Sequence, residues 1–163
     1  LVLVGLLPTY FFEIPASSTG KYHPEYSLGF GGLLRHTKAA FKIANDLVRN
    51  LDFELSEIEK DLSLLAIMLH DGFKSGYIQE KYTRADHPHL AADFVINNKA
   101  LLFLSDEEII KVADAIRSHS GRWTTDYQGN EILPKPETNM SKFVHLCDYL
   151  ASRKYLAVDI NDL

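Results

Sequence analysis

Four side chains that can bind a metal ion lie far apart in the sequence, namely His36, the adjacent pair His70 and Asp71, and Asp148. Each lies in, or at the end of, an apolar helical pattern, where a polar side chain destabilises the fold unless it finds a partner. Together they offer imidazole nitrogens and carboxylate oxygens, the ligand mixture that holds a divalent transition metal. Such a metal lowers the pKa of a bound water and acts as a Lewis acid on phosphoryl oxygens. The residue types therefore indicate a divalent-metal site, and a metal bound there could activate a water.

The order H…HD…D resembles the HD superfamily of metal-dependent phosphohydrolases. The segment LLAIMLHDGFK is similar to the family's central apolar helix ending in HD, although Gly72 and Phe73 reverse the more usual order of an apolar residue and a glycine. Lys74 stands four residues after His70, where the family commonly has a lysine that reaches the substrate phosphate. The resemblance implies catalytic roles for Asp71 and Lys74, and it implies that the primary metal ligands are His36, His70, Asp71 and Asp148.

Two further histidines extend the resemblance to the two-metal branch that includes the HD-GYP cyclic-dinucleotide phosphodiesterases. The stretch HPHLAADFV is similar to that branch's helix start, which makes His87 a ligand. SHSGRW resembles its second histidine element, with His119 as the ligand and Ser120 where a second histidine often stands. Asp71 has two oxygens and would bridge the two ions. The expected cofactor is one or two divalent transition metals, with two favoured, drawn from Mn, Fe, Co, Ni or Zn, with Mg as a further candidate.

Two other stretches resemble the HD-type 3′-5′ exoribonucleases, in which this domain is fused to an OB module. They are PASSTGKYHPEYSLGFGGLLRHT and SHSGRW…LPKPET…HLCDYL, so the resemblance covers residues 15 to 155. The chain has no room for an OB module and lacks the GYP element. CDYLASRK is similar to compact, stand-alone HD proteins of bacteria and phages. We expect hydrolysis of a nucleotide, with two alternatives: a 3′-5′ exonuclease on single-stranded RNA or DNA, and a non-catalytic metal-containing nucleotide-binding module.

The composition is that of an ordinary globular protein and predicts a single domain over residues 1–163. A net charge of −5 argues against a partner that is a long nucleic acid, because such binders usually carry a basic face. Cys147 is the only cysteine, which excludes an internal disulfide and a thiolate cage and favours a cytoplasmic location. The apolar run over residues 1–7 is too short to span a membrane and is expected in the core. The absence of an initial Met suggests that leading residues are missing.

Apolar periodicity predicts an all-α fold, an HD-domain bundle of about five to seven helices. Capping boxes start two of the helices, Ser56 with Glu59 and Ser105 with Glu108. Gly72 is expected to end the second helix just past His70 and Asp71, because both side chains reach one ion most easily where a helix stops. The expected helices cover residues 33–47, 56–71, 87–95, 105–119 and 138–155.

The connections between these helices are expected to be irregular or functional. Residues 11–32 are rich in glycine, proline and serine, as in loops. The polar stretch between residues 119 and 138 is longer than an ordinary helix connection, and such loops are functional or disordered. A short hairpin is expected around Gly129 and Asn130.

Charged and aromatic residues near the ligands are candidates for binding a small phosphorylated substrate, such as a nucleotide. Lys74 and Arg122 lie within a few residues of a ligand position and are expected to contact phosphate. A base could stack on Tyr82, Trp123 or Tyr127. The expected substrate-binding cations are Lys74, Arg122, Arg84 and Lys21.

Overall fold

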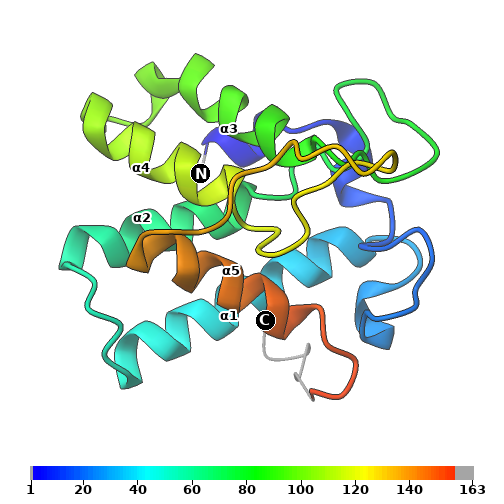
Figure 1. Ribbon diagram of the computed structural model, residues 1–163, viewed down its shortest axis with the longest axis horizontal. Coiled ribbons are helices and arrows are strands. Elements are labelled where there is room, and N and C mark those ends of the chain that lie inside the picture. Colours follow the sequence, from blue (N-terminus) through cyan, green and yellow to red (C-terminus); the bar gives the residue numbers. More distant parts are fainter. Residues whose placement is uncertain (1, 157–163) are drawn as a thin grey trace.

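The fold is all-α, as predicted. A computed structural model of the chain describes residues 2–156, and no named strand occurs in that range (Figure 1). The α-helices are α1 (Gly32–Asn50), α2 (Glu57–Leu69), α3 (His87–Asn97), α4 (Asp106–Arg117) and α5 (Asn139–Ala151). Short 3₁₀ helices are η1 (Val2–Leu6), η2 (Thr9–Phe12), η3 (Glu25–Ser27) and η4 (Lys99–Leu101).

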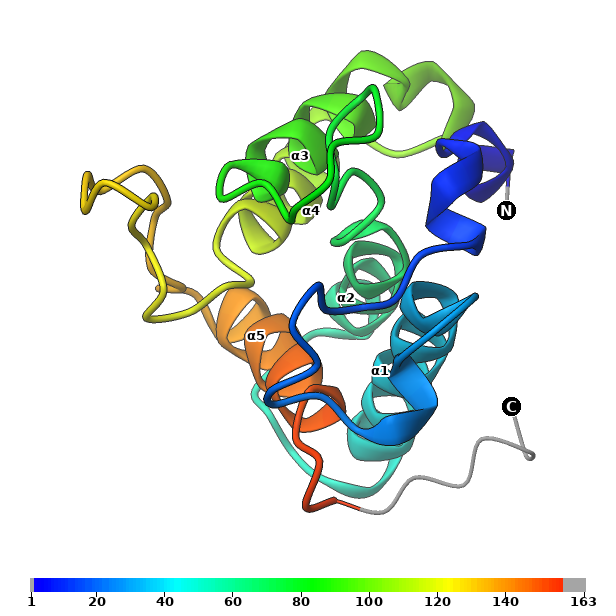
Figure 2. The same cartoon turned by 90° about the vertical axis from the view of Figure 1, so that its right-hand side faces the viewer.

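Helix α2 lies in the centre of the bundle and contacts α1, α4 and α5. Helix α5 packs along α1 on one side, and α3 packs along α4 on the other, as Figures 1 and 2 show. One hydrophobic core runs through these contacts. Many of its fully buried residues are alanines, which let helix backbones approach closely: Ala39, Ala40, Ala44, Ala66, Ala91, Ala92, Ala113 and Ala151.

The helix starts follow local side-chain chemistry. Both predicted capping boxes are present, at Ser56 with Glu59 and at Ser105 with Glu108. Such a cap stabilises a helix by about 1 kcal/mol. A third, unpredicted box joins Thr138 to Ser141 at the start of α5.

Helix α5 ends at Ala151, earlier than the predicted residue 155. The Ser152 hydroxyl donates a hydrogen bond to the Tyr149 carbonyl, and the backbone then leaves the helix. The Lys154 N–H donates to the carbonyl of Tyr22 at 3.1 Å instead of continuing the helical pattern. This contact with a distant segment ends the helix, which is why the local sequence did not predict the boundary.

Helix α2 also ends earlier than predicted, at Leu69, with His70 as its C-cap. Gly72 is not the helix stop. Its N–H donates to the Leu69 carbonyl in a tight turn, and a Cβ at this position would lie 2.7 Å from Leu7 Cδ2. A side chain here would press against Leu7, because the N-terminal segment packs directly against the turn that carries Asp71.

The N-terminal segment contributes to the core, as expected, although in 3₁₀ form. Leu3 and Leu7 are buried, and the Tyr10 hydroxyl donates to the Gly76 carbonyl at 2.5 Å. Burial raises the pKa of Tyr10 to about 12, so this hydroxyl remains a donor. The segment therefore supports the turns that follow α2.

The irregular segment before α1 is held against the helix by close backbone packing. A Cβ on Gly32 would lie 2.2 Å from the Ser27 carbonyl oxygen, so only glycine fits there. The Tyr26 hydroxyl donates to the Ala151 carbonyl at the end of α5. These contacts place Tyr22 and His23 beside the C-terminal end of α5.

The long segment between α4 and α5 stands out from the bundle (Figure 2). The expected hairpin is limited to an isolated antiparallel bridge between Thr125 and Glu131, with Gly129 at a φ of +88° in the turn. The Asp126 carboxylate accepts hydrogen bonds from the N–H groups of Gln128 and Asn130. Side-chain bonds within the turn therefore order this loop.

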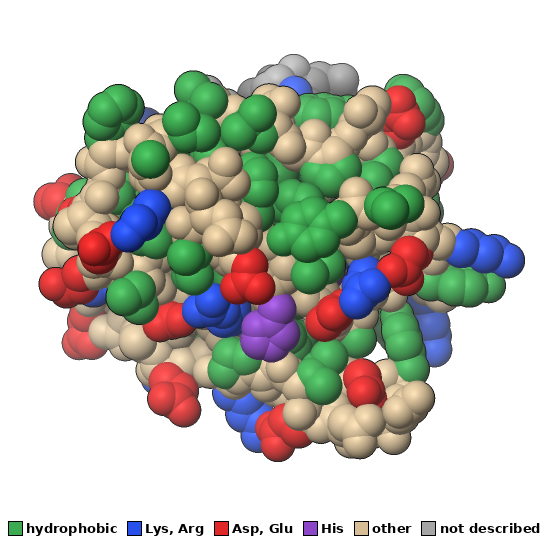
Figure 3. Space-filling model, turned by 90° about the horizontal axis from the view of Figure 1, so that it is seen from above, with side chains coloured by type: hydrophobic (Ala, Val, Ile, Leu, Met, Phe, Trp, Pro, Cys, Tyr) green, Lys and Arg blue, Asp and Glu red, His purple; other side chains and the backbone are tan. Residues whose placement is uncertain are grey.

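The face seen from above carries a broad group of hydrophobic side chains (Figure 3). At this end of the bundle lie η1 and η4, where Val2, Leu6, Leu101 and the adjacent Phe103 are exposed. None of these four side chains lines the cavity described below. Within residues 2–156, no helix combines the length and apolar character needed to cross a membrane.

Candidate metal centre and adjoining cavity

The fold brings together all six residues expected to bind metal. His36 comes from the start of α1 and Asp148 from the last turns of α5. His70 and Asp71 follow α2 directly, His87 is the first residue of α3, and His119 follows α4. All are buried except Asp148, whose side chain is 20% exposed. Every α-helix of the described chain, or the turn that follows it, therefore contributes a residue to one centre.

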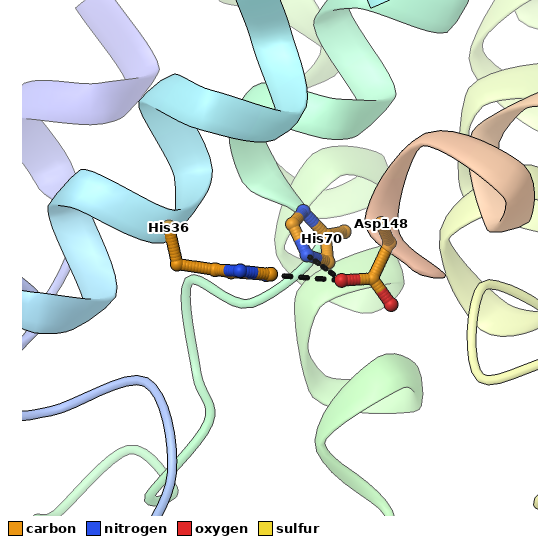
Figure 4. Close-up of side chains that lie close together, drawn as sticks. All are labelled: His36, His70 and Asp148. Atoms are coloured by element: carbon orange, nitrogen blue, oxygen red, sulfur yellow. Dashed lines mark hydrogen bonds and ion pairs between the residues drawn. The ribbon is translucent and has the colours of Figure 1, made fainter. Parts of the chain in front are cut away.

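A first cluster joins His36, His70 and Asp148 (Figure 4). Asp148 Oδ1 lies 2.9 Å from His36 Nε2 and 3.4 Å from His70 Nε2. The Oδ2 atom of Asp71 lies 3.7 Å from His36 Nε2 and 3.5 Å from His70 Nε2. Ligand atoms bonded to one ion at about 2.0–2.2 Å stand about 3–3.5 Å apart. The four side chains thus match the spacing of a metal site.

The other oxygen of Asp71 faces a second cluster. Asp71 Oδ1 lies 3.0 Å from His87 Nε2 and 3.6 Å from His119 Nε2, and these two nitrogens are 3.3 Å apart. The carboxylate therefore presents one oxygen to each cluster, as a bridge between two ions requires.

Backbone carbonyls orient three of the four imidazoles. The Nδ1 atoms of His70, His87 and His119 each lie 2.7 Å from the carbonyl oxygen three residues earlier, in Ile67, Arg84 and Ile116. A carbonyl only accepts, so Nδ1 carries the proton, and in the neutral ring Nε2 is left with a lone pair. Burial lowers the pKa of His87, which keeps its ring neutral.

When the rings are neutral, their Nε2 atoms and Asp71 Oδ1 are acceptors that converge on one point. Consistent with this, His70 Nε2 and Asp71 Oδ1 are buried and lack a hydrogen bond within the described chain. Buried acceptors without a donor are costly. A cation at this point would satisfy them, so the donor set fits a divalent metal.

The carboxylates of the centre are strongly acidic. Burial alone would raise the pKa of Asp71, but the Lys74 ammonium and His70 outweigh it and hold that pKa well below the usual range. Burial likewise acts against Asp148, and its contacts with His36 and His70 lower its pKa. For His70, burial lowers the pKa but the charges of Asp71 and Asp148 raise it, with a net increase. The negative charge of Asp71 and Asp148 favours a proton on His70, and it would also attract a divalent cation. Binding of the cation would displace that proton.

A cavity of about 390 Å³ opens beside the clusters. Its inner wall includes His87, His119 and Asp148, so a ligand inside it reaches the metal centre. Lys74 also lines the cavity, and its Nζ contacts Asp71 Oδ2. An ammonium has three donors, so two remain for a substrate. Arg122 lies at the cavity as well, with its guanidinium 4.9 Å from the Trp123 ring centroid.

The other two cations expected to bind substrate do not line this cavity. The Arg84 guanidinium pairs with Asp86 at 2.7 Å and Glu80 at 2.6 Å, so its charge is compensated. Its carbonyl instead orients His87. Lys21 is exposed and lies 5.0 Å from the centroid of Tyr22, which does line the cavity.

Two further histidines, His23 and His145, line the cavity and are not among the predicted site residues. The His23 ring lies 5.5 Å from the His36 ring, and burial, followed by Lys74, lowers its pKa to about 4. His145 Nδ1 donates to the His119 carbonyl at 2.7 Å. His145 lies three residues before Asp148 in α5, but its contact with His119 across the bundle has no local sequence signal. Gly121, at a φ of +66°, leaves the space that this ring occupies.

Comparison with known families agrees with the geometry. The HD domain model matches residues 33–153, most of the chain, so the protein belongs to the HD domain family. HD domains form a superfamily of metal-dependent phosphohydrolases that bind divalent metals. Comparisons with curated proteins and with solved structures gave no significant match.

Proposed function

We propose that this protein is a metal-dependent phosphohydrolase that cleaves a phosphoester or phosphoanhydride of a nucleotide. The observation that carries the proposal is that the two carboxylate oxygens of Asp71 face different clusters. Oδ1 faces His87 and His119. Oδ2 faces His36 and His70. A structural role for a buried carboxylate would require donors at both oxygens. Lys74 donates to Oδ2, but Oδ1 is buried and has no hydrogen bond within the described chain. The arrangement supports a two-ion centre with Asp71 as the bridge.

In this proposal each of the two ions is held by a different set of residues. His36, His70 and Asp148 would hold one ion, His87 and His119 the other. When bound, the ions would supply an activated water and positive charge for the phosphoryl oxygens. Lys74 would donate from its remaining N–H groups to the phosphate, while its contact with Asp71 keeps that carboxylate ionised.

A small phosphorylated substrate is supported by the charge distribution around the cavity. Lys74, Arg122 and Arg153 are the cations that line it, and the chain as a whole carries −5. A protein that grips a long strand neutralises many phosphates and binds less tightly as salt rises. Three cations at one cavity support contact with one or two phosphates, so we expect a shallow salt dependence.

The test combines metal analysis with a substrate panel. We expect transition metal in protein purified without chelator, and turnover of nucleoside mono- or triphosphates. His70→Ala should lose metal and turnover, while Asp93→Asn, on the exposed surface of α3, should retain both. Lys74→Ala and Arg122→Ala should lower turnover but keep the metal, because neither supplies a ligand atom. Absence of metal, together with unchanged turnover in His70→Ala, would refute the proposal.

The panel also tests the exonuclease alternative. Exposed aromatic rings and uncompensated arginines at the cavity mouth are features that bind single strands. Shortening of a single-stranded oligonucleotide from its 3′ end, with free nucleotides left intact and a steep salt dependence, would favour that reading.

A further inference from the structure

Two aromatic rings, Trp123 and Tyr149, face each other at the cavity. Their centroids are 6.4 Å apart and their planes differ by 20°. Carbon atoms in van der Waals contact are about 3.5–4.0 Å apart, so a flat ring inserted between two others needs roughly 7 Å. The centroid distance of 6.4 Å is an upper limit on the separation of the two ring planes, so a ligand ring enters between them only when one of the two rings moves outward.

The two sides of this pair differ in how firmly they are held. Tyr149 belongs to α5 and is adjacent to Asp148, so its position is tied to the metal centre. Trp123 is 49% exposed and lies on the loop after α4, four residues beyond His119. An outward movement of Trp123 would open a slot while Tyr149 stays in place on α5.

Two arginines adjoin the aromatic pair without acidic partners. The Arg153 guanidinium lies 4.5 Å from the Tyr149 centroid and 5.8 Å from that of Tyr22, and Arg122 lies 4.9 Å from that of Trp123. Among the described residues neither arginine has a carboxylate partner; Arg153 bonds only to the Ser152 hydroxyl. Their charge is therefore available to a ligand, in contrast to Arg84.

One ligand chemistry fits both ends of the cavity. The inner end offers metal-binding groups and Lys74, which suit a phosphoryl group, and the outer end offers parallel aromatic faces flanked by cations. A sugar phosphate or an inorganic polyphosphate has no flat ring for the outer end. A nucleotide has both a phosphoryl group and a flat base. Stacking of a base on an aromatic side chain contributes about 1–3 kcal/mol of binding free energy.

We propose that Trp123 and Tyr149 form a base-binding slot, with Arg122 and Arg153 beside it, that selects phosphoesters carrying a nucleobase. The assignment of the inner end to a phosphoryl group rests on the proposed function; the slot itself rests on the ring geometry. The base can come from a free nucleotide or from the end of a single strand.

Trp123 is the only tryptophan of the chain, so its fluorescence reports on this slot alone. The metal-loaded full-length protein would be titrated with adenosine 5′-monophosphate, with ribose 5-phosphate and with a short single-stranded oligonucleotide. Adenosine monophosphate should quench the fluorescence and saturate, and ribose 5-phosphate should not quench at the same concentrations. Quenching by the oligonucleotide alone would assign the slot to strand ends, and quenching by both to the base in either form.

Variants separate the slot from general effects. Tyr149→Leu should weaken adenosine monophosphate binding by at least about tenfold, the lower part of the range for one stacking contact. Trp123→Leu should weaken binding by a similar factor, measured by calorimetry because this variant has no tryptophan. Trp123→Phe should keep most of the affinity because phenylalanine also has a flat ring. Phe103→Leu removes an exposed aromatic side chain outside the cavity and should bind as the unmodified protein does. Thermal unfolding would verify that each variant is folded.

The outcomes distinguish this proposal from the proposed function. Base-dependent quenching in a protein that hydrolyses no phosphoester would support the slot and refute the phosphohydrolase. Equal turnover of nucleotides and of base-free phosphoesters, with no quenching, would refute the slot and leave the phosphohydrolase standing. Unchanged affinity in both Tyr149→Leu and Trp123→Leu would also overturn the slot.

Discussion

The two clusters of the metal centre are built in different ways. His36 and Asp148 meet across 112 residues of sequence through the packing of α1 against α5. His87 and His119 project from helix ends, and each is oriented by a carbonyl three residues earlier. His36 has no such partner, and its buried Nδ1 makes no hydrogen bond within the described chain.

The difference has a physical origin in the helices. Inside α1 the carbonyls are used by the helical hydrogen bonds, so none is free for the ring of His36. At the C-terminal ends of α2 and α4 the last carbonyls lack helical partners, and Ile67 and Ile116 offer theirs to His70 and His119. The contact between His36 and Asp148 therefore depends on bundle packing for its precision, whereas the rings of His70 and His119 are oriented by the local turns at the helix ends.

The largest effect is expected for Asp71→Asn, because this residue belongs to both clusters. The amide keeps the volume but replaces one oxygen and the negative charge. Loss of a residue that supports a metal ligand costs 10–100-fold in affinity or activity, and loss of the bridging ligand should exceed about 100-fold. We expect both ions to be lost in elemental analysis. Retention of two ions per chain would show that Asp71 is not the bridge.

Asp148→Asn should break the first cluster only. The amide nitrogen would face the Nε2 atoms of His36 and His70, which lie 2.9 and 3.4 Å from Oδ1. We expect the metal content to fall from two ions to one, with a large loss of turnover. Native mass spectrometry measures the stoichiometry directly, and loss of both ions would show that the clusters do not fill independently.

His87→Ala should break the second cluster and leave the first in place. His36, His70 and Asp148 stay intact, so one ion should remain. We expect a smaller loss of turnover than for Asp148→Asn, on the order of 10–100-fold. The same stoichiometry measurement serves as the readout. An equal or greater loss of turnover than in Asp148→Asn would contradict this expectation.

Arg84→Ala should give the smallest effect, because it removes a support and no ligand. Its ion pairs with Glu80 and Asp86 are partly exposed, and such pairs contribute about 0.2–1 kcal/mol each before screening. The carbonyl that orients His87 remains in the variant. We expect a slight fall in unfolding temperature and a few-fold weaker second ion, measured by metal titration with the first ion as internal reference. A loss of the first ion would contradict the separation of the clusters.

Local sequence signals predicted the helices and the helix starts well. Apolar periodicity and the capping boxes of Ser56 and Ser105 involve residues close together in the sequence, so they can be predicted without knowledge of the fold. The end of α5 was misplaced because a distant contact decides it, the hydrogen bond from the Lys154 N–H to the Tyr22 carbonyl. The role of Gly72 was also misjudged, because this residue gives room to Leu7 and does not end α2.

The sequence by itself determined which side chains could bind a metal, since the residue types and the resemblance to HD proteins singled out six. Only the tertiary structure decided that they converge, that the oxygens of Asp71 face two clusters, and which cations reach the cavity. Arg84 and Arg122 are the same residue type, and each lies three residues from a histidine of the metal centre. Arg84 nevertheless pairs with two carboxylates, whereas Arg122 lies at the cavity. The reason is that a charge is compensated by whichever groups the fold places beside it, and sequence distance does not determine those neighbours.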